Sequence, residues 1–119
     1  MPGAMVLGTS LVQVLARARG EAELEIDTAR AQFDQTTGWE RPQKCIELAK
    51  ALLSAAAIET ETAVQAERRD EARRLLLEVA AAADVYRKGE LASLLLWAGW
   101  AQDAAGVLRS VVEDPSLSI

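Results

Sequence analysis

The sequence predicts an all-α fold, either antiparallel helical hairpins stacked as a short α-solenoid or a compact multi-helix bundle. Half of the 119 residues are apolar but only 4% are aromatic, so the core must be built from Ala, Leu, Val and Ile. Such residues, mixed with Arg and Glu, favour closely packed helices. No long stretch alternates apolar and polar residues, as a half-buried strand would. The length suits a single domain over residues 1–119, with loose ends at 1–8 and 116–119.

Two helices are expected before the first loop. Ser10 suits the N-cap of a helix over residues 11–19, and Gly20 suits the position just after its end. A second helix over 21–35 begins with acidic residues that complement the helix dipole. These are Glu21, Glu23, Glu25 and Asp27, and the apolar face consists of Ala22, Ile26, Ala29 and Phe33. Because a glycine within a helix costs only about 1 kcal/mol relative to alanine, one continuous rod is the alternative.

A loop and a third helix follow. The residues Thr36-Thr37-Gly38 end the second helix, and Pro42 suits the first turn of the next, where its missing N–H is not needed. This helix is expected to run to about Ile58, and Trp39 is expected to pack over its start. Its core face consists of Cys45, Leu48, Ala49, Leu52 and Ala56.

The segment 59–70 has the least regular pattern. Thr60 and Thr62 are poor helix formers and good caps, and the apolar stripe fades there. We expect a short helix over 61–68 and a turn at Arg69-Asp70; a single helix over 61–83 is the alternative. The strong helix over 71–83 has apolar residues at helical spacing. They are Ala72, Leu75, Leu76, Val79, Ala80 and Ala83.

The most apolar part of the chain lies between Tyr86 and Pro115. It is apolar at nearly every position from Leu91 to Trp100, with Gly99 as an interruption. A second apolar series follows, and Pro115 prevents its helix from continuing. We therefore expect a helix over 86–98, a tight turn, and a second helix folded back against the first.

The residue pattern of the helix over 71–83 recurs in the helix that follows Gly99. Asp70-Glu71-Ala72, Leu76 and Val79 recur as Gln102-Asp103-Ala104, Leu108 and Val111, in each case 32 residues later. A helical hairpin that recurs at such a period is typical of stacked helix pairs.

The stretch 86–115 resembles a tetratricopeptide repeat. In that family the first helix has an apolar and a small residue together and then a large apolar residue, a glycine makes the turn, and the second helix has a small and then a large residue before a terminal proline. The residues at these positions, in order, are Leu91-Ala92, Leu95, Gly99, Ala104, Leu108 and Pro115. Two positions depart from the family pattern, since Pro115 and the aromatic residue after the turn glycine, Trp100, each come one residue early. In the hairpin that precedes Tyr86, only the second helix matches the pattern. The resemblance implies stacked hairpins whose first helices line a concave ligand-facing surface. Here that surface would include Tyr86, Gly89, Ser93, Leu96 and Trp97.

The helix over 86–98 has more large apolar residues than one buried face can hold. An exposed Trp97 beside Leu96 would form a partner site of the hot-spot type. The candidate partner-binding residues are Tyr86, Ser93, Leu96, Trp97 and Trp100. The simpler interpretation is that Trp97 belongs to the core, covered by the first three helices. A third is that this surface forms a homodimer interface.

No pattern typical of catalysis, metal binding or cofactor binding is found, so we expect no enzyme and no cofactor. The chain has no His, so Cys45 lacks an imidazole base and zinc lacks a common ligand. Cys45 lies in an apolar series and is expected to be a small buried residue. The basic cluster is interleaved with acidic residues, which predicts a solvated, salt-bridged helix face. It consists of Arg68, Arg69, Arg73 and Arg74.

The charge and the motifs together favour a protein partner. The net charge of −5 argues against nucleic acid, and no signal peptide or membrane-length segment is found, so we expect a cytoplasmic protein without membrane contact. We expect a non-catalytic interaction module, an adaptor or small chaperone-like domain that holds a peptide or helix of another protein. The alternative is a structural helical bundle that self-associates as a homodimer.

Overall fold

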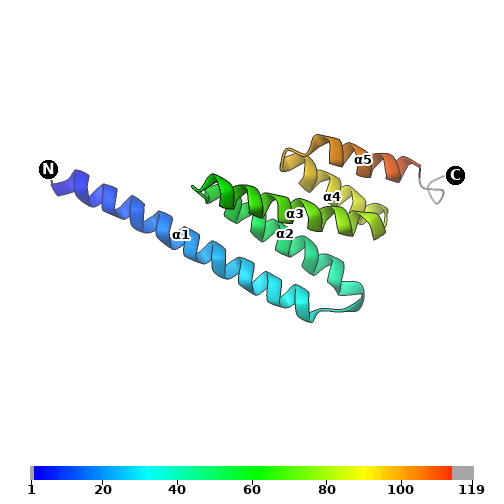
Figure 1. Cartoon of the computed structure of the whole chain (residues 1–119), viewed down its shortest axis with the longest axis horizontal. Coiled ribbons are helices and arrows are strands. Elements are labelled where there is room, and N and C mark those ends of the chain that lie inside the picture. Colours follow the sequence, from blue (N-terminus) through cyan, green and yellow to red (C-terminus); the bar gives the residue numbers. More distant parts are fainter. Residues whose placement is uncertain (1, 114–119) are drawn as a thin grey trace.

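The computed structural model describes residues 2–113, with side chains from Leu11 onward, and no strand occurs among them. This confirms the predicted all-α class. The helices are α1 (Pro2–Gln35), the 3-10 helix η1 (Gly38–Glu40), α2 (Arg41–Ile58), α3 (Thr62–Ala82), α4 (Val85–Trp97) and α5 (Ala101–Val112). Figure 1 shows α2 with α3, and α4 with α5, as two successive antiparallel hairpins, while α1 lies along the first hairpin.

The predicted break at Gly20 is wrong and the alternative of a single rod is confirmed, because α1 is one continuous helix of 34 residues. It also includes residues 2–8, which were predicted to be a loose end, whereas 116–119 lie outside the described residues. Ser10 is therefore not an N-cap, and the acidic residues from Glu21 to Asp27 lie within the helix rather than at its start. The small cost of a glycine in a helix is offset by the packing of the second half of α1 on the first hairpin.

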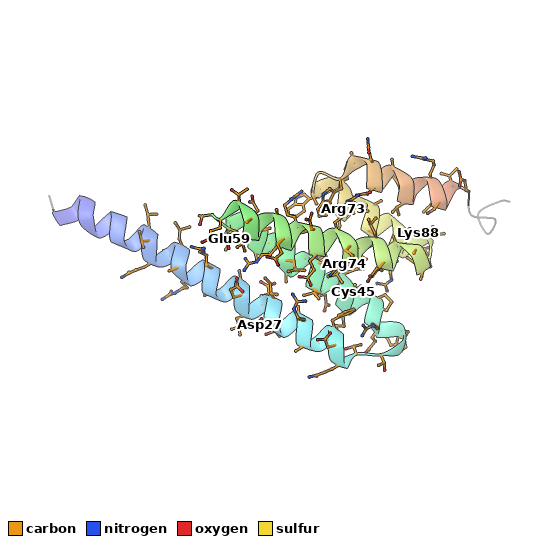
Figure 2. The ribbon with its side chains drawn as sticks, in the orientation of Figure 1. Asp27, Cys45, Glu59, Arg73, Arg74 and Lys88 are labelled. Atoms are coloured by element: carbon orange, nitrogen blue, oxygen red, sulfur yellow. The ribbon has the colours of Figure 1, made fainter. Side chains whose placement is uncertain are left out.

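The second half of α1 packs its predicted apolar face onto the core. Ile26 is buried, and Ala22, Ala29 and Phe33 pack against the buried cluster. The first half projects beyond the tip of the α2–α3 hairpin, where Glu59 lies (Figures 1 and 2). The described chain is consequently elongated, with extents of 71 × 31 × 24 Å.

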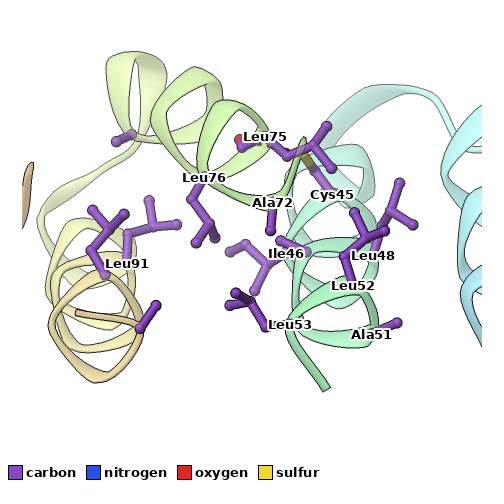
Figure 3. Packing of buried hydrophobic residues seen from close by; sticks show 14 of the residues in the cluster. Cys45, Ile46, Leu48, Ala51, Leu52, Leu53, Ala72, Leu75, Leu76 and Leu91 are labelled. Carbon is purple, nitrogen blue, oxygen red and sulfur yellow. Dashed lines mark hydrogen bonds between the residues drawn. The ribbon is translucent and has the colours of Figure 1, made fainter. Parts of the chain in front are cut away.

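The centre of the structure is α2, which is buried on several sides at once. Half of its 18 residues are buried, and Ala49 and Ala55 have no exposed surface. Figure 3 shows Ile46 and Leu53 on the side of α2 that faces Leu76 of α3, with Leu91 of α4 beyond Leu76. Small alanine side chains let the neighbouring helices approach closely, and the branched residues fill the space between them.

The turn predicted at Arg69-Asp70 is wrong, and the alternative of one helix is confirmed, since α3 runs without a break from Thr62 to Ala82. Buried residues in its second half (Ala72, Leu75, Leu76) hold it against α2. The break that the sequence predicted near Thr60 is confirmed. There the Gln65 side-chain amide donates to the Ala56 carbonyl oxygen at 2.9 Å and closes the hairpin tip.

The turn between α4 and α5 has the geometry of a helix ended by glycine. Gly99 has a φ of 94°. The Trp100 N–H donates to the Leu95 oxygen at 2.8 Å, and the Gly99 N–H donates to the Leu96 oxygen at 3.0 Å. This pair of hydrogen bonds is the Schellman motif. At the other end of α4, the Asp84 carboxylate caps the helix by accepting from the Arg87 N–H at 2.8 Å. Pro115 lies outside the described residues.

The two hairpins share a buried pattern that the 32-residue alignment did not detect. Leu48-Ala49, Leu52 and Ala55 in α2 and Leu91-Ala92, Leu95 and Ala98 in the second hairpin are all buried, at an offset of 43 residues. The second helices keep the offset of 32, so the first hairpin is longer at its tip by eleven residues. Much of this extra length is at the start of α3.

We predict that Gly99→Ala destabilises the protein. A side chain at this positive φ is strained, at a cost of about 1–2 kcal/mol. Gly106→Ala is the matched control, since Gly106 lies within α5 and nothing is within 4 Å of an added Cβ. It should stabilise by about 0.5–1 kcal/mol, because alanine favours the helix. Urea unfolding of both variants measures the difference, and equal effects would contradict the strained turn.

Candidate interaction surface

One side of α4 is exposed to solvent along the whole helix. Leu91, Ala92 and Leu95 form its buried side. On the opposite side Tyr86 is 92% and Trp97 is 71% exposed, with Leu96 and Ser93 exposed beside them. The interpretation that the first three helices cover Trp97 is therefore wrong. A helix of 13 residues buries one face against the core, and α1 covers the first hairpin instead.

We call Tyr86, Ser93, Leu96 and Trp97 the α4 face. They lie at positions that share one side of a helix. Gly89, also implied by the tetratricopeptide resemblance, is exposed between them, and no atom lies within 4 Å of an added Cβ there. The structure thus brings four of the five candidate partner-binding residues together on one surface.

The fifth candidate, Trp100, lies apart from the α4 face. Trp100 is partly buried against the core, and the Arg69 guanidinium stands 4.9 Å from the centre of its ring. The same guanidinium donates to the Ala98 oxygen at 2.7 Å. Arg69 therefore connects the α4–α5 turn to α3, and the Trp100 side chain packs within the protein.

Two polar contacts join α4 to α2. Lys50 of α2 lies 3.8 Å from Glu90 of α4, and Arg87 donates to the Gln43 side-chain oxygen at 3.1 Å. Lys50 also lines a shallow hollow of about 520 Å³ between α1 and α2, together with Leu24 and Glu47. This hollow is lined by residues of α1 and α2 and includes none of the α4 face. The sequence did not indicate Leu24 or Lys50, since nothing in their spacing relates α1 to α2.

A second hollow of about 640 Å³ lies where the end of α1 meets η1, α2 and α3, and Trp39 stands at it. Trp39 is 84% exposed, so the prediction that it packs over the start of α2 is wrong. Arg41, the first residue of α2, contacts the end of α1 instead. Its guanidinium lies 4.0 Å from the centre of the Phe33 ring and donates to the Phe33 oxygen at 2.9 Å and the Thr36 oxygen at 3.1 Å.

Cys45 borders this second hollow but is buried, as the sequence predicted. Its thiol lies 3.6 Å from the Leu75 carbonyl oxygen. Burial, with a smaller contribution from Glu78, raises the pKa of the thiol to about 11. A thiol held in its protonated form is a poor nucleophile.

We predict that Cys45 resists alkylation in the folded protein. With a pKa of about 11, only about one thiol in a thousand is ionised at pH 8, and the sulfur is also sterically covered. Iodoacetamide labelling followed by mass spectrometry should show modification only after urea unfolding. Rapid labelling of the folded chain would contradict the burial.

Most ion pairs among the described residues join different elements, and Lys44–Glu47 within α2 is an exception. The predicted solvated, salt-bridged face of α3 is correct only in part, because Arg68 and Arg73 form ion pairs with other elements while Arg69 is partly buried against Trp100. Arg68 pairs with Glu23 of α1 and with Glu59 at the hairpin tip, and Arg73, labelled in Figure 2, pairs with Asp103 of α5 at 2.6 Å. Arg30 of α1 pairs with Glu71 of α3 through two hydrogen bonds of 2.6 and 3.0 Å. Among the side chains described, no group of three or more His, Cys, Asp or Glu is placed to hold a metal ion.

The Arg30–Glu71 pair makes stability depend on pH. The hydrogen bond from Arg30 lowers the pKa of the Glu71 carboxyl in the folded protein. The contribution of this pair to the free energy of unfolding is therefore fully present above about pH 4.3, the ordinary pKa of glutamate. It is lost as the pH falls through the lower pKa that Glu71 has in the folded protein. Glu71→Gln should melt at a lower temperature at pH 7 and lose less stability on acidification.

Thermal melts between pH 7 and pH 3 test this expectation. Glu67→Gln, at an exposed position on the same helix, is the control and should keep the wild-type slope. An unchanged slope in Glu71→Gln would show that the pair makes no such contribution.

Comparison with known proteins finds no match: no family model, no curated protein and no solved structure. None of the helices within residues 2–113 is long and apolar enough to cross a membrane.

Proposed function

We propose that the chain is a non-catalytic protein–protein interaction module, an adaptor or small chaperone-like domain. In this proposal the α4 face holds a peptide or helix of another protein. The supporting observation is that two aromatic side chains, Tyr86 and Trp97, stand almost free of the core on one face with Leu96. Exposed aromatic residues that gather on one face are typical of binding hot spots.

The resemblance of 86–115 to a tetratricopeptide repeat supports the same surface. It implies that the first helix of a hairpin faces the ligand, and α4 is the first helix of its hairpin. Tyr86 and Trp97 are eleven residues apart, which corresponds to about 16 Å along the helix axis. That length matches about three turns of a partner helix.

The charged residues on α4 beside the face have both signs. Arg87 and Lys88 follow Tyr86 directly, and Glu90 is paired with Lys50 of α2. Because charge at the rim of an interface mainly affects association rate and partner choice, we expect apolar contacts to supply most of the affinity. The net charge of −5 disfavours nucleic acid, and the unpaired buried Cys45 suits the reducing cytoplasm in which we place the protein.

Binding of selected peptides tests the α4 face. We expect a peptide library displayed on phage to yield ligands, and Trp97→Ala to weaken their binding by at least about 30-fold, the loss typical of a hot-spot residue. Trp39→Ala is the matched control, because Trp39 is 84% exposed against 71% for Trp97 but lies away from the α4 face, at the hollow beside η1. Both variants should keep the wild-type melting temperature.

Equal binding by wild type and Trp97→Ala would contradict the proposed site. Equal losses in the two tryptophan variants would contradict it as well, since the effect would not be specific to the α4 face. A structural bundle that self-associates as a homodimer is the alternative function, and a different surface supports it.

A further inference from the structure

The first part of α1 extends beyond the rest of the described chain. Arg19 pairs with Glu59 at 3.0 Å, which marks the point where α1 passes the hairpin tip. Figure 1 shows no described helix beside α1 on the N-terminal side of this point. Leu11 is 65% exposed, and Val12, Val14 and Leu15 are exposed with it. We call residues 2–18 the arm.

The exposed apolar residues of the arm continue an interface that already exists. Leu11 and Leu15 lie at helical spacing from Ala22, Ile26 and the rest of the face that α1 packs on the core. The C-terminal half of this stripe is covered by the first hairpin, and the N-terminal half is not. An apolar helix face rich in small residues, like that of α2, would bury the N-terminal half of the stripe as α2 buries the C-terminal half.

The charge pattern indicates a second copy of the chain. The sequence has no charged residue before Arg17, although 26% of its residues are charged overall. The arm carries a single charge, on Arg17 near its C-terminal end, so two arms can pair antiparallel with these charges far apart, whereas the remainder of the chain is acidic and repels itself. A strongly basic or acidic partner, by contrast, would gain little from an arm with one charge.

We propose that the arm pairs with the arm of a second copy, antiparallel and about a two-fold axis. The antiparallel arrangement places the two acidic bodies at opposite ends, whereas a parallel one would bring them together. Overlap of residues 2–18 of the two copies gives a pairing of about 25 Å, in which the described start of each arm lies near the partner's hairpin tip. Such an interface is closed, so it yields a dimer rather than a filament.

This pairing uses a surface separate from the α4 face. The proposed self-association can therefore be disproved without affecting the proposed peptide binding, and the reverse also holds. The test is sedimentation velocity across a wide range of concentrations. We expect wild type to be dimeric, and the double variant Leu11→Glu/Leu15→Glu to dimerise at least about 100-fold more weakly, because two apolar contacts per arm are lost in each copy.

Leu24→Glu is the matched control. Leu24 is on α1 and 66% exposed, nearly the same as Leu11, but it lies on another side of the helix in the hollow shared with α2. This variant should remain dimeric. A monomeric wild type at all concentrations would overturn the proposal, and so would a double variant that dimerises like wild type.

Disulfide cross-linking tests the orientation and does not depend on the glutamate variants. Cys45 is buried, so a single introduced cysteine is the reactive one. Leu11→Cys lies near the proposed two-fold axis and should cross-link to its mate on oxidation. Ala18→Cys is on the same face, but antiparallel pairing separates it from its mate by more than about 20 Å, so it should not cross-link. Efficient cross-linking through Ala18→Cys, or none through Leu11→Cys, would overturn the antiparallel arrangement.

Discussion

The burial of α2 is the constraint on which the other helices depend. With half of its residues buried, α2 is covered by α1 on one side and by α3 and the second hairpin on the other. Ala49, Ala55 and Ala72, which have no exposed surface, keep the helices close together. Close packing of this kind tolerates little added volume, since overpacking a core typically costs about 1–3 kcal/mol.

The ion pairs add orientation to this apolar core. Arg30–Glu71 joins α1 to α3, and Arg73–Asp103 joins α3 to α5. Partly exposed pairs contribute little free energy, but bidentate contacts between arginine and carboxylate are geometrically selective. Arg69 acts similarly through its contacts with Ala98 and Trp100. The second hairpin is thus fixed to α3 near its turn and along α5, which leaves the outer side of α4 free.

The sequence predicted the helices more reliably than their breaks or their surroundings. Apolar spacing located the buried faces of α1 and α3, and Pro42 and Gly99 marked a helix start and a turn correctly, because their backbone preferences are local. Gly20 and Asp70 suggested breaks that tertiary packing overrides at small cost. The sequence placed Trp39 wrongly and left the exposure of Trp97 open, because exposure depends on which residues from distant parts of the chain pack nearby. Trp39 is 84% exposed while Arg41 contacts Phe33, and Trp97 is 71% exposed in the described part of the chain.

The uninterrupted course of α1 through Gly20 has a consequence for how the protein would present its surfaces. A helix of 34 residues spans about 51 Å as a rigid rod. A partner bound to the first part of α1 is therefore held at a fixed distance and angle from the two hairpins, because Gly20 does not act as a hinge. Two bodies joined through such rods would present paired binding faces with a fixed separation. Weak contacts at each face would then combine into avidity, but only for ligands whose own spacing matches.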